Sequence, residues 1–300
     1  MSDCKWSELR GRVLGMKRII IGSILGAGLT ALFGYPLRSV DSATPEHAGY
    51  LGFDRNEYPG DENLRVLRQT FSFSGYWLNN PPGATSNSWI GKRGVVQAAG
   101  FGFLVVFNGR TDAQIKSARD ATKLGNSDGA LAVSSARRDA FPIGTIIFLD
   151  QEEGGRLLPE QRVYLHAWVD AVKSAGFRAG VYCSGIAFKE GSGASVITAE
   201  DIQQNAGGRE MAYWVSNDAC PPSPGCAFPR KPAMPPESGV SFADVWQFAQ
   251  SPRRADFATG CSASYSHDGN CYPAGTEGQR LHLDLDVGYS PDPSHGRTGD

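Results

Sequence analysis

The sequence has little net charge, and it has no histidines at metal-ligand spacing from its cysteine pairs. Its 300 residues carry 29 Lys and Arg against 31 Asp and Glu, which gives a formal net charge of −2. Because a nucleic-acid-binding protein needs a basic face, this balance argues against a nucleic-acid partner. Neither of the two close cysteine pairs has His at ligand spacing, so no zinc site is predicted, and we expect no metal and no cofactor.

Motifs for phosphate binding and for serine catalysis are also missing. The sequence contains no GxxxxGK[ST] and no strand-linked GxGxxG, so the pairs Asn108-Gly109 and Gly154-Gly155 are interpreted as turns. It contains no G-x-S-x-G nucleophile elbow either. These absences argue against a P-loop or dinucleotide-binding protein and against a serine hydrolase of that type.

The apolar run near the N-terminus is shorter than the about twenty residues that a membrane-spanning helix needs. It covers residues 19–33 and follows the basic pair Lys17-Arg18, which is the pattern of a signal peptide. We expect residues 1–43 to be a signal peptide cleaved near Ser42-Ala43. The alternative is an uncleaved anchor, which would be the only contact with a membrane. Both predict an exported protein that is secreted, periplasmic or on the cell surface.

Cysteine usage agrees with export. Cys220 and Cys226 flank a Pro-rich loop, and Cys261 and Cys271 flank a polar one. Two close pairs in turn-rich segments predict two local disulfides and an oxidising compartment. Cys183 lies on a predicted strand, where we expect a free buried thiol.

Eight short apolar segments alternate with helical stretches along the chain. The predicted strands are residues 49–54, 71–78, 101–107, 145–150, 178–183, 212–216, one within 240–248, and 281–287. The predicted helices between them include residues 111–123, 129–140 and 159–175. This rhythm predicts the α/β class, as a (β/α)8 TIM-type barrel, regular or irregular, with disulfide-bearing loop insertions.

No internal repeat and no linker divides the mature chain. We therefore expect one barrel domain over residues 44–290, with the Pro-rich segment 217–241 as a surface insertion. The polar residues 291–300 are expected to form a flexible tail.

Acidic residues stand at the ends of three predicted strands, where barrel enzymes carry their reacting groups. Asp54 ends the first strand, Asp150 ends the fourth and is followed by Glu152, and Asp284 and Asp286 end the eighth. Side chains alternate across a strand, so Asp150 and Glu152 share one face. In the last strand leucines alternate with the acids. The leucines suit the face that packs against the helices, so the acids are expected to point into the barrel. Acids that point into a barrel are costly unless they are paired or used.

Crowded carboxylates predict acid/base chemistry, because repulsion raises the pKa of at least one of them and keeps it protonated. Cleavage of a glycosidic bond needs one carboxylic acid and one carboxylate. We assign Glu152, which has the longer reach, as the proton donor and Asp150 as its charged partner. Asp54 and Asp284 complete the predicted catalytic set.

Aromatic and polar side chains near the predicted strand ends could hold a sugar. Flat rings stack on sugar faces, and amides and acids hydrogen-bond to hydroxyl groups. The predicted substrate-binding residues are Trp214, Trp246, Gln247, Tyr76, Tyr182 and Asp286. No metal ligand is predicted.

Four of these motifs together resemble a known family. Phe53-Asp54, the D-x-E at 150–152, the WQF at 246–248 and the LDLDV at 283–287 are similar to the ordered landmarks of family 25 muramidases. With the GVY at 180–182, the chain looks closer to the glycoside-hydrolase-like barrels of exported bacterial proteins. The resemblance covers about residues 48–290.

The resemblance implies hydrolysis of a cell-wall glycan, peptidoglycan or a related amino-sugar polymer, without a metal. It implies that Glu152 is the general acid, that Asp150 supports the transition state and that Asp54 and Asp284 complete the site. The acetamido group of the substrate would replace a protein nucleophile. Asp286 and Glu153 are acids that the muramidases do not share, and the disulfide-bearing insertions have no counterpart.

Two alternatives to a glycosidase stay open. The first is a non-catalytic glycan-binding module on the same barrel, since a fold does not guarantee an activity. The second is a structural surface protein whose barrel carries the loops. Release of reducing ends from a glycan, retention on that glycan, or neither would distinguish the three.

Overall fold

The computed structural model describes residues 48–299, apart from 116–117, 192, 258, 260, 262–263 and 274–279. The expected leader, residues 1–43, lies outside the described residues. None of the helices in the described part is long and apolar enough to cross a membrane.

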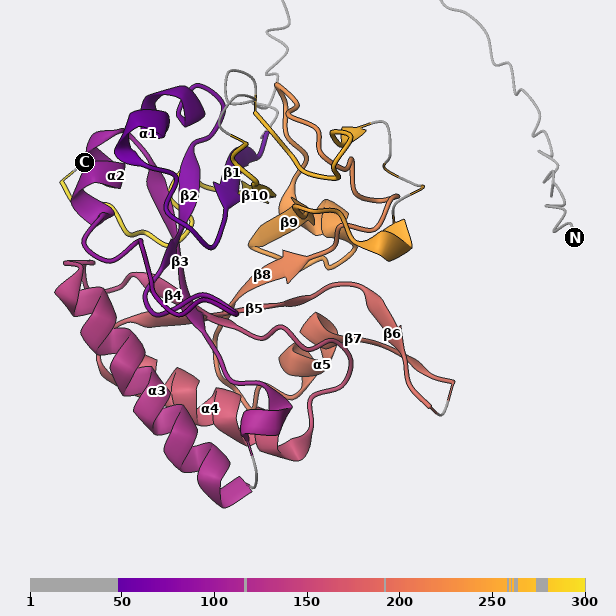
Figure 1. Ribbon diagram of the computed structural model, residues 1–300. Helices are drawn as coiled ribbons and strands as arrows, with labels where there is room; N and C mark the ends of the chain where they lie inside the picture. The colour runs from indigo at the N-terminus through magenta and orange to yellow at the C-terminus, as the bar shows by residue number, and fades with distance from the viewer. Residues whose placement is uncertain are drawn as a thin grey trace, which may run out of the picture. The chain divides into compact units, whose positions relative to one another are not determined.

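Eight strands close into a barrel in the order β1-β10-β9-β8-β5-β4-β3-β2, which confirms the predicted fold class (Figure 1). The barrel strands are β1 (Tyr50–Asp54), β2 (Phe73–Trp77), β3 (Gly102–Asn108), β4 (Ile146–Asp150), β5 (Arg178–Ser184), β8 (Ala212–Ser216), β9 (Val245–Ala249) and β10 (Asp284–Gly288). Each coincides with one of the eight predicted segments to within a few residues.

The last strand runs against its neighbours. β10 pairs antiparallel with both β1 and β9, whereas the other adjacent strands pair in parallel. A parallel neighbour needs a crossover that returns the chain to the opposite end of the barrel. The connection from β9 makes no such return, and its described part contains only the short 3₁₀-helix η3 (Ala255–Phe257). The amino end of β10 therefore lies at the mouth of the barrel, beside the carboxyl ends of the other strands.

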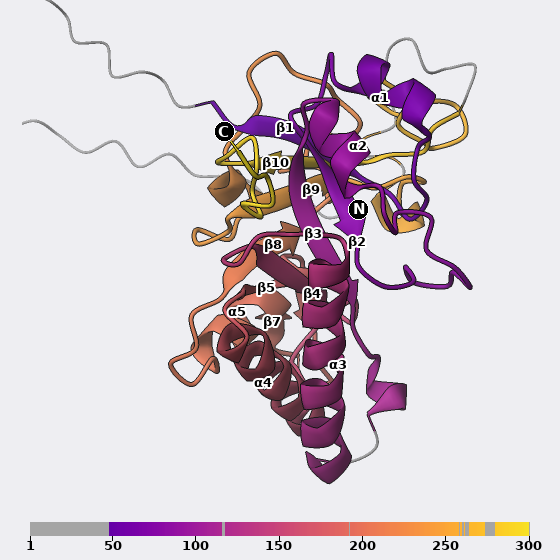
Figure 2. The same cartoon turned by 90° about the vertical axis from the view of Figure 1, so that its left-hand side faces the viewer.

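Helices cover only part of the barrel. The long helices α3 (Ala118–Arg138) and α4 (Pro159–Ser174) pack side by side next to β4 and β5 (Figure 2). The shorter helices are α1 (Asp61–Leu67), α2 (Arg93–Ala98) and α5 (Thr198–Gln204). A hairpin of β6 (Ala187–Lys189) and β7 (Ser195–Ile197) projects from the connection between β5 and α5 (Figure 1).

Residues 111–140 form the 3₁₀-helix η1 (Asp112–Gln114) and then the single helix α3, where the sequence predicts two helices. The predicted break contains Gly125. A Cβ at Gly125 would lie 2.4 Å from the backbone oxygen of Tyr164, and one at Gly129 would lie 3.0 Å from that of Trp168. These glycines therefore serve close packing of α3 on α4, and they do not end the helix.

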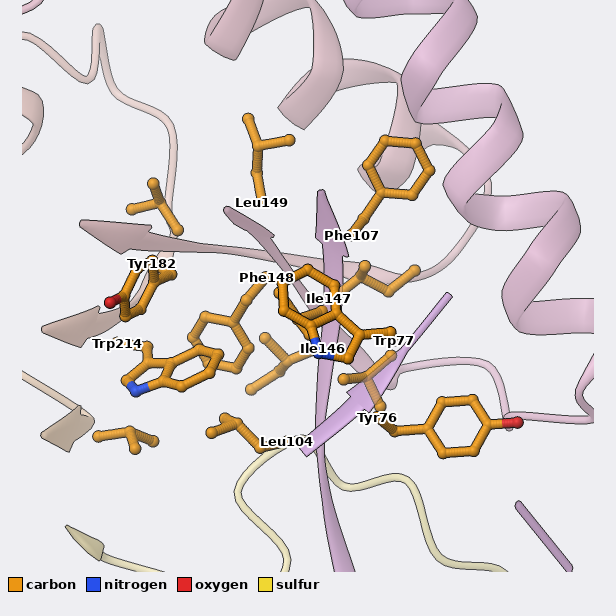
Figure 3. Close-up of a cluster of buried hydrophobic side chains, with 14 of the residues drawn as sticks. Tyr76, Trp77, Leu104, Phe107, Ile146, Ile147, Phe148, Leu149, Tyr182 and Trp214 are labelled. Atoms are coloured by element: carbon orange, nitrogen blue, oxygen red, sulfur yellow. The ribbon is translucent and has the colours of Figure 1, made fainter. Parts of the chain in front are cut away.

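Aromatic and aliphatic side chains fill the barrel below its mouth (Figure 3). The indole of Trp214 meets the ring of Phe148 at a centroid distance of 6.1 Å and the ring of Tyr182 at 4.6 Å, both edge to face. This packed layer lies directly below the polar groups at the mouth of the barrel.

The end of the chain packs under the barrel, which corrects the expectation of a flexible tail. Ser294 is fully buried. Its backbone N–H donates to the Phe103 oxygen at 2.9 Å, and its oxygen accepts from the Ile146 N–H at 2.8 Å. The Asp292 carboxylate accepts from the Phe103 N–H at 2.8 Å. The tail thus satisfies backbone groups at the amino ends of β3 and β4 that burial would otherwise leave unpaired.

The disulfides join two different loops, so the predicted local pairing is wrong. Cys220 pairs with Cys261 and Cys226 with Cys271, with Cα–Cα distances of 5.9 and 5.4 Å. The insertion after β8 and the loop after β9 lie against each other, so each cysteine meets one from the other loop. Cys183 is free and buried, as predicted, and burial raises the pKa of its thiol.

Candidate active site

A cavity of about 210 Å³ lies at the mouth of the barrel and draws its walls from most of the strands. The predicted site residues that line it are Asp54, Asp150, Glu152, Tyr182, Trp214, Gln247 and Asp284. The structure thus brings all four predicted catalytic residues together. Their catalytic roles stay a prediction.

The reversal of β10 explains how Asp284 reaches this cavity. The sequence predicts Asp284 near the carboxyl end of a parallel strand, but it is the first residue of an antiparallel one. In the register of β1 and β10, Asp54 pairs with Asp284 and Gly52 with Asp286. Asp284 therefore stands at the mouth, whereas Asp286 stands two residues deeper.

Gln247 holds two of the acids. The Tyr182 hydroxyl donates to Gln247 Oε1 at 2.8 Å, which turns the amide nitrogen of Gln247 toward the acids. That nitrogen donates to Asp54 Oδ2 at 2.8 Å and reaches Asp284 Oδ2 at 3.5 Å. The Ser251 backbone N–H donates to Asp284 Oδ1 at 2.6 Å. Burial raises the pKa of Asp54 to about 6, although the bond from Gln247 opposes the rise.

Asp150 and Glu152 form a hydrogen-bonded pair across the cavity wall. Both oxygens of Asp150 are buried, and neither accepts a hydrogen bond from a donor group in the described part of the chain. Burial first, and then the nearby charge of Glu152, raises the pKa of Asp150 well above its usual value. Glu152 is open to solvent on its cavity side, but the surrounding walls raise its pKa too, while the bond from Asp150 lowers it. The raised pKa values of the two acids favour a protonated form of the pair, and Glu152 is the member that is accessible from the cavity.

Asp286 lies beneath the cavity rather than in its wall. It is fully buried, and its Oδ1 accepts a hydrogen bond from the indole nitrogen of Trp214 at 2.9 Å. Burial, followed by the charge of Asp54, raises the pKa of Asp286 well above its usual value, and the acid is hydrogen-bonded to Asp54. The raised pKa favours the neutral form of Asp286, which supports Asp54 from below. Its predicted direct contact with substrate does not fit this buried position.

Two of the predicted aromatic residues point away from the cavity. Tyr76 packs on the rings of Phe103 and Phe141, and Figure 3 shows its ring turned away from Trp214. Its neighbour Trp77 lines the cavity instead. Trp246 is buried on the outer side of β9, where its indole nitrogen donates to the Asn217 backbone oxygen at 2.8 Å. Neighbouring residues on a strand face opposite sides, so Trp77 faces the cavity in place of Tyr76, and on β9 the predicted Gln247 faces it whereas Trp246 does not.

Loop residues complete the wall, and sequence patterns did not reveal them. They are Asn56, Pro82, Gln250, Ser251 and Pro252. Gln250 donates to Gln247 Oε1 at 3.0 Å, so it extends the network around the acids. These residues belong to no motif, and only the closed barrel brings them to the mouth.

Glu153 fixes the loop that carries Glu152. Its carboxylate accepts hydrogen bonds from the Asp112 backbone N–H at 2.9 Å and from the side chain of Gln161 at the start of α4. The residue after the D-x-E is therefore tied to η1 and α4, which leaves Glu152 as the acid that faces the cavity.

The mouth extends beyond the central cavity. Glu152 also borders a hollow of about 330 Å³ beside the β6–β7 hairpin and another of about 190 Å³ beside Arg110. Glu152 thus stands where three hollows meet. In the described residues, no cluster of His, Cys, Asp and Glu has the geometry of a metal site.

The structure is thus a closed α/β barrel with several acids gathered at its mouth. Residues 85–226 match the family described as the Rv2525c-like, glycoside hydrolase-like domain. This match includes Asp150, Glu152, Tyr182 and Trp214. The resemblance predicted from the sequence is thereby confirmed, and residues 85–226 are similar to a glycoside hydrolase-like domain.

Three solved structures are similar to this chain. An uncharacterized protein from B. stearothermophilus is 18% identical, with a TM-score of 0.51 over 80% of this chain and 96% of that chain. The Tat-secreted protein Rv2525c from Mycobacterium tuberculosis is 10% identical, with a TM-score of 0.49 over 82% and 97%. The catalytic domain of endolysin ply40, from bacteriophage P40 of Listeria monocytogenes, is 15% identical, with a TM-score of 0.47 over 84% and 99%. No curated protein matches this chain.

Proposed function

We propose that this protein is a glycoside hydrolase that cleaves an amino-sugar glycan of the cell wall, peptidoglycan or a related polymer, by carboxylate acid/base chemistry. The observation that carries the proposal is the pair of Asp150 and Glu152, two acids that line an open cavity and whose surroundings raise the pKa of both. Glycosidic cleavage needs such a group, because the leaving oxygen must be protonated as its bond breaks.

Glu152 is the proton donor in this proposal, since it is the member of the pair that faces the cavity. The acetamido oxygen of the sugar attacks its own C1 carbon, the glycosidic bond breaks and the leaving oxygen takes the proton of Glu152. Glu152 then removes a proton from the water that opens the resulting ring. Asp150 orients the acetamido group, while Asp54 stabilises the positive charge that develops at C1.

The location proposed for this reaction is outside the cytoplasm. Two disulfides close the loops around the mouth, and such bonds persist in oxidising compartments. The signal-like segment at residues 17–33 supports export as well.

The test is the variant Glu152→Gln, which keeps the shape of the side chain and removes its acid. We expect release of reducing ends from purified peptidoglycan to fall at least about a hundredfold, the usual minimum for a lost general acid. Affinity for the glycan should stay near that of the wild type. Glu210→Gln, which removes an exposed carboxylate elsewhere, is the matched control.

Three outcomes separate the proposals. A wild-type protein that releases reducing ends, and loses this activity only in Glu152→Gln, supports the glycosidase. Retention on peptidoglycan without any release would replace it with a glycan-binding module. If the protein neither binds nor cleaves any amino-sugar polymer, the barrel is a scaffold.

A further inference from the structure

A second cavity, of about 510 Å³, opens beside the acidic one. The two share Asn56, Ser251 and Asp284, so they adjoin each other. The other residues that line the second cavity are Arg55, Glu57, Arg280 and His282. Basic groups thus gather next to the acidic centre.

The backbone of Arg55 is firmly placed. Its oxygen accepts hydrogen bonds from the indole nitrogens of Trp77 at 3.1 Å and Trp89 at 3.3 Å. Arg55 follows Asp54 directly, so the same strand end that carries an acid into the first cavity carries a guanidinium into the second.

The guanidinium of Arg55 is poorly satisfied. Its Nη2 lies 3.6 Å from the carboxylate of Glu57, a side chain that is 83% exposed. Its Nε and Nη1 are buried and have no hydrogen-bond partner in the described residues. By contrast, Arg110 donates from Nε and Nη2 to the two oxygens of Asp128, at 2.6 and 2.8 Å. An ion pair with a carboxylate as exposed as that of Glu57 contributes little, and buried charged donors without partners are costly.

The charge around Arg55 is not balanced by the protein. Arg280 and His282 are exposed at the same cavity, and neither forms an ion pair among the described residues. Two carboxyl groups border the cavity, Glu57 and Asp284. Burial and the neighbouring Asp54 raise the pKa of Asp284 well above its usual value, which favours its neutral form. An excess of positive charge therefore remains.

We infer that the cavity bordered by Arg55, Arg280 and His282 is a subsite for a carboxylate carried by a sugar of the substrate. This inference rests on the proposed function, because it assumes a glycan in the neighbouring cavity. The carboxylate displaces the exposed Glu57 from the guanidinium, and a turn of the side chain gives the remaining donors a partner. Guanidinium groups bind carboxylates through two parallel hydrogen bonds, which suits Arg55 better than a lysine.

Binding in the full-length chain tests this subsite. The probe is peptide-free glycan strands from peptidoglycan, compared with the same strands after their carboxyl groups are reduced to alcohols. Calorimetry in a Glu152→Gln background measures affinity without cleavage. We expect the reduced strands to bind at least about tenfold more weakly, the effect of one charge-assisted contact.

The variants locate the effect. Arg55→Gln and Arg280→Gln should each reduce the preference for the carboxylated strands, and Arg55→Lys should restore only part of it. Lys123→Gln, which removes an exposed charge from α3, should leave it unchanged. Since the side chain of Arg280 is exposed, its variant stays informative if Arg55→Gln fails to fold.

The outcomes distinguish this inference from the proposed function. Equal affinity for carboxylated and reduced strands overturns the subsite, even if the wild type cleaves both. A preference that Arg55→Gln and Arg280→Gln remove, in a protein that cleaves neither polymer, keeps the subsite and rejects the glycosidase. If an oligouronide binds and peptidoglycan strands do not, the subsite still binds a sugar carboxylate, but peptidoglycan is not the glycan that carries it.

Discussion

Asp54, the last residue of β1, lies directly opposite Asp284, the first residue of β10, and the amide of Gln247 reaches both carboxyl groups. Two carboxyl groups at opposing positions of a strand pair repel each other when both are ionised, which adds to burial in raising the pKa of Asp284. The two residues face each other because β10, which closes the otherwise parallel barrel, runs antiparallel to β1. The free energy of unfolding should therefore depend on pH, because ionisation of both acids destabilises the folded state.

We predict that the protein loses stability as the pH rises from about 4 to above 6. Burial raises the pKa of Asp54 from 3.8 to about 6, so between these values the folded state binds more protons than the unfolded state. The free energy of unfolding then falls with rising pH, by about 3 kcal/mol for this group alone. Asp150, Asp284 and Asp286 act in the same direction, because their pKa values are also raised.

Urea unfolding at pH 4.5 and pH 7.5 measures this loss. Asp54→Asn should reduce it, since asparagine does not titrate, whereas Glu210→Gln should not. If Asp54→Asn and the wild type lose the same amount of unfolding free energy between these pH values, the pKa of Asp54 is not raised in the folded state.

The crossed disulfides make a prediction that a protease digest can check. Residues 210–230 and 255–280 are each released by trypsin as one peptide, and each contains two cysteines. With the pairs Cys220–Cys261 and Cys226–Cys271, the two peptides stay joined until they are reduced. Local pairs would give two separate peptides, which would contradict the structure. Because each bond closes a loop of more than forty residues, reduction should also cost about 4 kcal/mol per bond in the chain-entropy model.

Replacement of two helical glycines by alanine should change the free energy of unfolding in opposite directions. Glycine in a helix is less favourable than alanine by about 1 kcal/mol. At Gly94, in α2, no atom lies within 4 Å of an added Cβ, so Gly94→Ala should raise the free energy of unfolding by about that amount. At Gly125 the added Cβ would lie 2.4 Å from a backbone oxygen of α4, so Gly125→Ala should lower it. Thermal unfolding of both variants gives the signs, and stabilisation by both would contradict the close packing of α3 on α4.

The strands and the D-x-E pair could be predicted because their signals are local. Ile146–Asp150 is an apolar run that ends in an acid, and Glu152 follows at the spacing that keeps it on the same face. The direction of β10 could not be predicted, because leucines and acids alternate in either direction. It depends on where the loop after β9 lies, which contacts distant in sequence decide.

The choice between Tyr76 and Trp77 was also beyond the sequence. All five residues of β2 are buried and each face carries an aromatic residue, so neither face is marked by exposed residues. The alternation of side chains then fixes that these two residues face opposite sides, but not which side is the cavity. The same holds for β9, where Gln247 faces the cavity and Trp246 does not.

The β6–β7 hairpin should bind the part of a long glycan that extends past Glu152. Its Phe188 is 52% exposed and borders the hollow that also contains Glu152 and Tyr182. A Cβ at Gly155, in the loop after the D-x-E, would lie 3.0 Å from the Phe188 ring, so the hairpin packs on the loop that presents the acid. An exposed ring in this position can stack on a sugar.

Phe188→Ala should therefore weaken binding of long glycan strands by about two- to tenfold, the range of a single aromatic contact. A disaccharide that fills only the central cavity should bind as before. Since the ring is exposed, the free energy of unfolding should change by less than about 0.5 kcal/mol. Leu131→Ala, an equally exposed side chain on α3, should affect neither quantity. Unchanged affinity of Phe188→Ala for long strands would show that the substrate does not extend along the hairpin.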